Sequence, residues 1–363
     1  MLDTVYRLVE PRRFEPVEVA ITPGEHDIVV RPSYLSICRA DQRYYQGLRS
    51  ADVLSAKLPL ALIHEGIGVV VQDNSNNFAP GTRVVMIPND PATTLDDARV
   101  CLDADSRVGL HASCASDIDA KTFCRPISMF HGSDCDGFMQ ELAVLPSCCV
   151  ETIPDSIDNQ IGPCIELLSV AYNAVLQLAG GSIPAGATVG VWGDGNLGFL
   201  VALMLHVLYP QVAVVVMGKH ASKLASFTFV QQTVNSALGD RPPAVNYAVE
   251  CCGGRGSGDG IAQILSVIQP FGEVVLLSVS ETAVPIYTRT VLAKGIRFIG
   301  CSRSKREDFT HVIELLSAHP ELRTYLSALV NDVRTVRSVA DMAQAFEADA
   351  HNPMGKTIMQ WNV

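Results

Sequence analysis

The sequence has little positive charge and no long apolar segment. Lys and Arg number 27 against 38 Asp and Glu, which gives a formal net charge of −11. Nucleic acids and anionic membranes bind clustered positive charge, so this balance argues against both as main partners. The longest central apolar run, residues 197–205, is about half of the ~20 residues that a membrane-spanning helix needs.

We also expect no export signal and no disulfides. No apolar stretch stands before a cleavage site near the N-terminus, so we expect a cytoplasmic protein with reduced thiols. The eleven cysteines include no C-x-x-C pair. Cys101, Cys114, Cys124 and Cys135 are separated by 13, 10 and 11 positions. Structural zinc sites use shorter spacings, so no structural zinc is predicted.

What is present indicates an α/β protein of two domains. Hydrophobic residues form 48% of the 363 residues, and about 150 residues make one domain. Up to about residue 90, short β-type runs broken by Pro and Gly predict a bent antiparallel body. The polar residues 90–135 predict a long surface excursion.

Alternating strand and helix patterns begin near residue 186 and indicate a doubly wound parallel sheet. A helix is predicted over 308–319, and a strand over 355–361 is expected to rejoin the first domain. The predicted elements of the sheet region are strands at 187–192, 212–218, 245–250, 272–279 and 296–300, a helix from Asn196, a helix and then a strand within 221–230, and a helix at 258–269.

Trp192–Gly198 reads W-G-D-G-N-L-G, a G-x-G-x-x-G fingerprint between a predicted strand and a predicted helix. In that context the glycines permit a tight turn, close approach of a pyrophosphate and close helix packing. A strand–helix turn without a ligand is the alternative. The residues predicted to bind the cofactor here are Gly193, Asp194, Gly195, Asn196, Leu197 and Gly198.

The end of the second strand of this sheet bears on the choice of cofactor. NAD sites place Asp or Glu there, but this chain has Gly218, Lys219 and His220, with Lys223 one turn later. A small residue beside cations suits a 2′-phosphate, which favours NADPH. The alternative is that both lysines are simply solvated.

Three separate segments contain candidate metal ligands. Cys38 lies in SICRADQ, His64 and Glu65 lie in LIHEGIG, and Glu166 begins ELLSVA. A catalytic zinc needs about three N, S or O ligands, which these residues would supply together. Taken singly, Cys38 and His64 could be core residues, and the glutamates could pair with arginine.

These motifs follow one another in an order that resembles the zinc-dependent medium-chain dehydrogenase/reductase superfamily, over nearly the whole chain. Further segments, among them RPSYLSIC, DGFMQ and WGDGNLG, resemble the ribulose-5-phosphate reductases (ribitol-5-phosphate dehydrogenases) of CDP-ribitol synthesis. The resemblance implies a GroES-like, β-rich catalytic domain at 1–160 and 302–363. It also implies a Rossmann NADP-binding domain at 161–301.

The resemblance implies one catalytic zinc on Cys38, His64 and Glu65, with Glu166 ligating or just outside. We expect Asp41 to orient His64. A thiolate and two carboxylates leave such a site net negative, so we expect Glu166 to move off when substrate arrives.

The family often has Ser or Thr two positions after the first ligand, to relay a proton. This chain has Ala40 there, which carries no hydroxyl. Glu65, the phenol of Tyr44 or a water molecule is the expected proton source instead.

The implied reaction is reduction of D-ribulose 5-phosphate with NADPH, for CDP-ribitol and cell-surface polymer synthesis. Arg39, Arg43 and Arg303 are candidates for the substrate phosphate, although each could instead form a surface ion pair. A homo-oligomer and a pathway link to a cytidylyltransferase are expected by resemblance. The alternatives are a polyol or secondary-alcohol dehydrogenase on an unphosphorylated substrate, and a non-catalytic nucleotide-binding protein.

Overall fold

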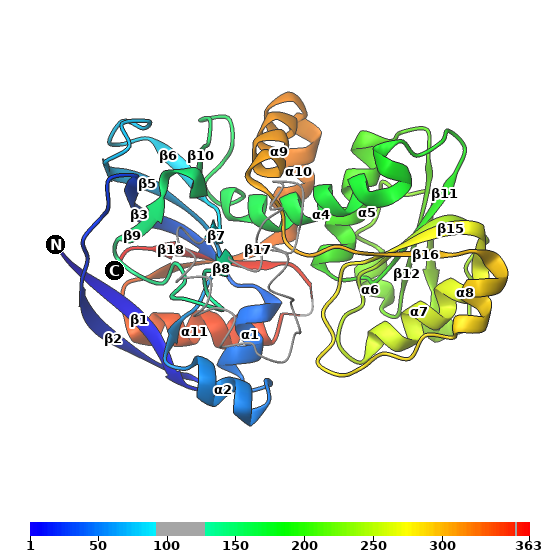
Figure 1. Cartoon of the computed structure of the whole chain (residues 1–363), viewed down its shortest axis with the longest axis horizontal. Helices are drawn as coiled ribbons and strands as arrows, with labels where there is room; N and C mark the ends of the chain where they lie inside the picture. The colour runs from blue at the N-terminus through cyan, green and yellow to red at the C-terminus, as the bar shows by residue number, and fades with distance from the viewer. Residues whose placement is uncertain (92–127, 353) are drawn as a thin grey trace, which may run out of the picture. The chain divides into compact units, whose positions relative to one another are not determined.

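The computed structural model describes residues 1–91, 128–352 and 354–363 (Figure 1). The chain forms two compact units, Met1–Glu166 with Ser304–Val363, and Leu167–Arg303. The predicted excursion at 90–135 lies mostly outside the described residues. Cys101, Cys114 and Cys124 also lie outside them, so the absence of a structural zinc stays a prediction.

The first unit is built on antiparallel strands, as predicted. Its main sheet has the order β10-β6-β5-β3-β18-β17, with β9 beside β3, and a second sheet has the order β2-β1-β4. Among the described strands of this unit, only β17 and β18 pair in parallel. Register shifts at Val29/Val30 and Pro32/Tyr34 interrupt the pairing of β3 with β5, as β-bulges do where strands bend. The strands are β1 (Leu2–Glu10), β2 (Arg13–Ala20), β3 (Asp27–Ser36), β4 (Leu60–Ala61), β5 (Glu65–Asp73), β6 (Arg83–Met86), β7 (Asn89–Pro91), β8 (Ser128–Phe130), β9 (Ala143–Pro146), β10 (Val150–Thr152), β17 (Val330–Val336) and β18 (Lys356–Trp361).

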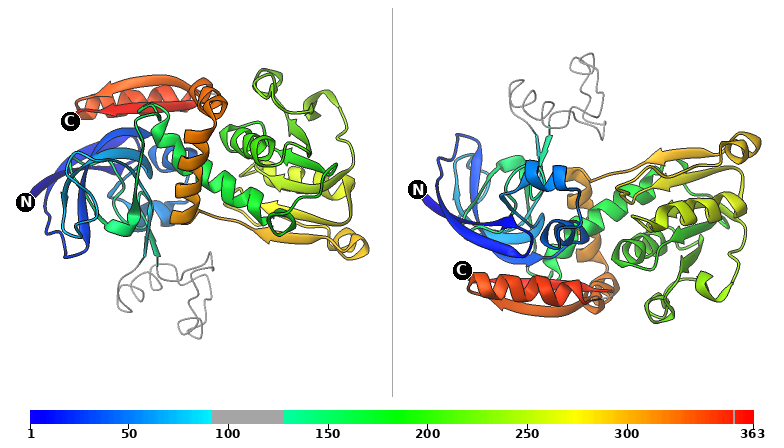
Figure 2. Two further views of the ribbon diagram at one scale, coloured as in Figure 1. Left: turned by 90° about the horizontal axis from the view of Figure 1, so that it is seen from above. Right: turned by 90° about the horizontal axis from the view of Figure 1, so that it is seen from below.

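The C-terminal segment joins this sheet, which confirms the prediction for residues 355–361. Strand β18 pairs antiparallel with β3, with Ile358 opposite Ser36. Helix α11 lies along β17 and β18 (Figure 2). Because Ser36 precedes Cys38 by two residues, the end of the chain lies beside the first candidate ligand. The helices of this unit are α1 (Arg39–Tyr45), α2 (Ala51–Lys57), α9 (Arg306–Ala318), α10 (Pro320–Leu329) and α11 (Val339–Ala350), and α4 (Ile165–Gln177) continues into the second unit.

The second unit is a parallel sheet of six strands in the order β13-β12-β11-β14-β15-β16. This order confirms the doubly wound sheet. Trp192, Val215, Ala248, Ile264 and Val274 belong to its buried core. The strands are β11 (Thr188–Trp192), β12 (Ala213–Gly218), β13 (Gln232–Asn235), β14 (Val245–Glu250), β15 (Ile268–Leu276) and β16 (Arg297–Gly300), and the helices are α5 (Asn196–Leu208), α6 (Ala221–Leu224), α7 (Gly256–Val267) and α8 (Thr288–Lys294).

One predicted strand was misplaced. The strand expected before Val230 begins instead at Gln232. Phe227 and Phe229 pack their rings on Phe199 of α5, with centroid separations of 5.3 and 5.2 Å. These aromatic side chains therefore fill the space under a helix, and the sheet pairing starts after them.

One helical stretch, Gly162–Gly181, is long and apolar enough to cross a membrane by length and composition. Within its most apolar window, 61% is buried inside the folded chain. A core helix passes the same test, so the expected absence of a membrane span stays a prediction.

Candidate functional site

The pairing of β3 with β5 brings the two ligand segments together. Ser36 lies opposite Glu65 in this ladder. Cys38 follows β3 as the N-cap of α1, and His64 directly precedes β5. The ligand atoms of Cys38, His64 and Glu65 all lie within 4.8 Å of one another. The structure thus assembles three of the four predicted metal ligands.

Asp41 ties these two segments to each other. Its Oδ2 accepts the backbone N–H of Cys38 (2.8 Å), and its Oδ1 accepts the backbone N–H of Ile63 (3.0 Å). Oδ1 also lies 3.7 Å from Nδ1 of His64. Burial by itself would lower the pKa of His64, but the charges of Asp41 and Cys38 raise it well above its usual value.

Glu65 has a buried cationic partner that sequence reasoning missed. Nζ of Lys356 lies 2.7 Å from Oε1 and 2.6 Å from Oε2 of Glu65. The side chains are 2% and 0% exposed. Lys356 opens β18, 291 positions from Glu65, and it appeared in the sequence only as part of a strand-like tail. The pairing of β18 with β3 is what brings it here.

The donor set fits a divalent zinc ion. Sulfur, imidazole nitrogen and carboxylate oxygen are the ligands zinc takes, and three of them leave a position open. The acidic groups here are buried close to one another. Burial and the charge of Glu65 raise the pKa of the Cys38 thiol, and burial raises the pKa of Glu166 to about 7. A bound cation would stabilise their deprotonated forms. Lys356 adds a positive charge beside these ligands, which the expected net charge of the site did not include.

Glu166 lies near this cluster without joining it. Its pKa responds to the charges of His64, Glu65 and Lys356. It is not among the residues whose ligand atoms lie within 4.8 Å of one another. The structure therefore leaves Glu166 as an outer ligand candidate.

The other predicted residues of this unit are more dispersed. Tyr44 is buried, with its hydroxyl 3.4 Å from Oγ of Ser133 and the guanidinium of Arg49 5.0 Å from its ring centroid. Arg39 is exposed and Arg43 is half-buried, both on α1.

The glycine turn of the second unit has the shape that a dinucleotide requires. Gly193 has φ +132°, and a Cβ there would lie 2.6 Å from the carbonyl oxygen of Cys251. A Cβ on Gly198 would collide with the carbonyl oxygen of Gly193. A Cβ on Gly195 would meet nothing within 4 Å, so the space in front of α5 is open to a ligand. Asn196 and Leu197 form the first turn of α5.

The predicted cation-rich segment lies at the end of β12. Gly218 ends the strand, and Lys219 and His220 lead into α6, which contains Lys223. Arg303 lies at the end of this unit with φ +62°.

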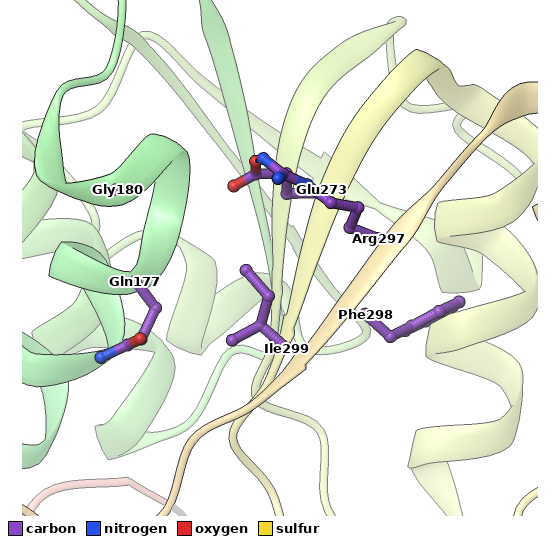
Figure 3. A pocket seen from close by; sticks show the side chains of 6 residues that line it. All are labelled: Gln177, Gly180, Glu273, Arg297, Phe298 and Ile299. Carbon is purple, nitrogen blue, oxygen red and sulfur yellow. The ribbon is translucent and has the colours of Figure 1, made fainter. Parts of the chain in front are cut away.

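A cavity of about 450 Å³ lies against the outer strand β16 of the same sheet (Figure 3). Glu273 forms an ion pair with Arg297 there and accepts the backbone N–H of Ala179 at 2.7 Å. The charged groups that line this cavity therefore pair with each other, and the lining includes none of the predicted site residues. Its lining consists of Gln177, Gly180, Glu273, Arg297, Phe298 and Ile299.

The chain is similar to known proteins over much or all of its length. Residues 24–155 match the family model described as the alcohol dehydrogenase GroES-like domain. The chain is 40% identical to the ribulose-5-phosphate reductase of Bacillus spizizenii, covering 100% of both chains. It is 39% identical to ribulose-5-phosphate reductase 1 of Staphylococcus aureus, covering 99% of both.

A solved structure is similar over the same length. The crystal structure of S. aureus TarJ in complex with NADPH has a TM-score of 0.83 and 36% identity, and it covers 100% of both chains. The chain belongs to the ribulose-5-phosphate reductase family, within the medium-chain dehydrogenase/reductase superfamily.

Proposed function

We propose that this protein reduces D-ribulose 5-phosphate to D-ribitol 5-phosphate with NADPH and one zinc ion. The cluster of Cys38, His64 and Glu65, in which Cys38 is half-buried and the other two are buried, carries the proposal, in a chain similar over its full length to proteins named ribulose-5-phosphate reductases. The product would feed CDP-ribitol synthesis for a cell-surface polymer, through a cytidylyltransferase.

Zinc held by Cys38, His64 and Glu65 would polarise the ketone oxygen, and NADPH would supply the hydride. The chain itself supplies position and charge. Asp41 holds the segments of Cys38 and His64 in fixed register. Lys356 offsets the charge of Glu65 without exposing either group to water.

Of the candidate proton sources, Glu65 is the least suited, which leaves Tyr44 and a water molecule. Both oxygens of Glu65 contact Lys356, which favours its ionised form and so opposes its acting as an acid. The Tyr44 hydroxyl lies 3.4 Å from the hydroxyl of Ser133, so a proton could be replaced along two hydroxyl groups.

The test is a substrate panel with NADPH and NADH, with and without a zinc chelator. Cys38→Ser should lose bound zinc and lower kcat/KM for ribulose 5-phosphate by about a hundredfold or more. Cys148→Ser removes an exposed thiol and should change neither. Faster turnover of free pentuloses or simple ketones would favour a polyol dehydrogenase. Wild-type protein without zinc or turnover would favour a non-catalytic nucleotide-binding protein.

The phosphate site is proposed to include Arg43, with Arg39 and Arg303 as further candidates. Arg43→Ala should raise KM for ribulose 5-phosphate about tenfold, and much less for unphosphorylated pentuloses. Equal increases for both substrates would remove Arg43 from the phosphate site.

A further inference from the structure

One carboxylate fastens the glycine turn to the end of β12. Asp194 stands between the first two glycines of the fingerprint. Its Oδ2 accepts the backbone N–H of Lys219 at 2.7 Å and that of His220 at 2.8 Å. Nδ1 of the His220 ring donates to the same oxygen at 2.9 Å. The loop that follows β12 is therefore held by a residue from the loop that follows β11.

Asp194 also excludes any side chain at the last position of β12. A Cβ on Gly218 would lie 2.6 Å from both Cβ and Oδ2 of Asp194. An acid at the end of this strand is what binds the ribose 2′-hydroxyl in NAD sites. Here Oδ2 of Asp194 already accepts three hydrogen bonds, so that oxygen is committed to the loop.

His220 presents the other side of its ring to solvent. The side chain of His220 is 58% exposed, whereas that of Asp194 is 11% exposed. Nδ1 must be the donor to Asp194, because a carboxylate only accepts. Nε2 is then the ring nitrogen left to meet a ligand, and in the imidazolium form it donates a hydrogen bond.

Lys223 adds charge one turn further on. Its backbone N–H donates to the carbonyl oxygen of His220 at 3.1 Å, so both residues belong to one turn. No ion pair occupies the Lys223 ammonium within the described parts of the chain. Lys219 has a long contact of 3.5 Å between its Nζ and Oδ2 of Asp259.

We propose that His220 is a specificity-determining residue for the 2′-phosphate of NADPH, and that Asp194 is the residue that positions it. This inference rests on the NADPH dependence proposed above. His220 Nε2 and Lys223 contact the phosphate. Asp194 aids phosphate binding despite its negative charge, because it fixes the loop that carries His220.

The direction in which Asp194→Ala changes nucleotide binding tests the inference. Binding of 2′,5′-ADP and 5′-AMP, which differ by the 2′-phosphate, is measured by calorimetry on the full-length zinc-loaded protein. His220→Ala should weaken 2′,5′-ADP binding about tenfold and 5′-AMP binding less than about twofold. Asp194→Ala should also weaken 2′,5′-ADP binding, whereas binding would tighten if the charge of Asp194 merely repelled the phosphate. Asp194→Asn, which keeps an acceptor oxygen, should retain binding.

The outcomes separate this inference from the proposed function. Wild-type protein that binds both nucleotides equally would defeat the NADPH dependence itself. A wild-type preference that His220→Ala leaves unchanged would overturn the role of His220. Equal or tighter 2′,5′-ADP binding by Asp194→Ala would overturn the positioning role. If Asp194→Ala fails to fold, Asp194→Asn decides instead. Retained 2′,5′-ADP binding by Asp194→Asn supports the positioning role, and weaker binding overturns it in favour of charge pairing between Asp194 and His220.

Discussion

Lys356 and Glu65 form a buried ion pair whose two members depend on each other. Removing two charges from water costs several kcal/mol per ion, and close contact between the charges offsets that cost. Removing only one partner leaves the other charge buried and uncompensated. Replacing one member of the pair should therefore destabilise the protein more than replacing both.

Lys356→Met should lower the free energy of unfolding of the metal-free protein by about 3–5 kcal/mol. The double variant Lys356→Met/Glu65→Met should recover much of that loss, because no unpaired charge remains. Denaturant unfolding measures both. A Lys356→Met protein as stable as wild type would show that Glu65 does not depend on this lysine.

Asp194 should also make stability depend on pH. Burial alone would raise its pKa, but hydrogen bonds from His220 and Lys219 hold the pKa below its usual value. The folded-state pKa is thus lower than the unfolded-state value of about 3.9. The stabilisation is complete above the unfolded-state value and disappears as pH falls through the folded-state value.

Comparing wild type with Asp194→Ala checks the direction of this pH dependence. The difference in their unfolding free energies should be constant above about pH 5 and should shrink as pH falls below about 4. Unfolding curves at several pH values give the difference. A difference that grows on acidification would contradict the low pKa of Asp194.

At the scale of elements, the turn between β11 and α5 uses its glycines for two different purposes. Gly198 lets α5 approach the backbone of Gly193, so its small size serves the fold. Gly195 faces open space, so its small size serves only a ligand. The two positions form a matched pair for substitution.

Gly198→Ala should destabilise the protein by about 1–3 kcal/mol, because the helix must move away from the turn. Gly195→Ala should leave the melting temperature nearly unchanged but weaken NADPH binding about tenfold or more. Thermal unfolding and nucleotide titration separate the two effects. If Gly195→Ala binds NADPH normally, the pyrophosphate does not lie at this position.

At the scale of the whole molecule, we expect the outer edge of β16 to be the interface, if the homo-oligomer expected by resemblance forms. β16 ends the strand order, and no described residue pairs with its outer side. Phe271 on β15 and Leu292 on α8 are 83% and 81% exposed. A second copy adding its β16 would extend the sheet with twofold symmetry and cover an open edge.

Phe271→Asp combined with Leu292→Asp should raise the dissociation constant of the oligomer at least about tenfold. Leu238→Asp is the control, since Leu238 is 76% exposed but follows β13 at the opposite edge of the sheet. Light scattering over a concentration series gives the masses. A monomeric wild type would contradict the expected homo-oligomer. Unchanged masses in all variants would exclude this edge as its interface.

The amino-acid sequence alone determined the local features. Apolar runs with alternating strand and helix patterns predicted the parallel sheet, and spacing predicted the glycine turn between β11 and α5. These signals lie within about twenty residues, where periodicity and turn chemistry act. The identities of Cys38, His64 and Glu65 were readable for the same reason, as short motifs.

Only the tertiary structure decided which distant charges meet. Lys356 reaches Glu65 because β18 pairs with β3 in one register, and a pairing across 291 positions leaves no local pattern. Asp194 reaches His220 because β11 and β12 are neighbours in the sheet, so their carboxyl ends share an edge. Strand order and register, which depend on packing of the whole core, set the charge balance at the proposed metal site and the loop at the end of β12.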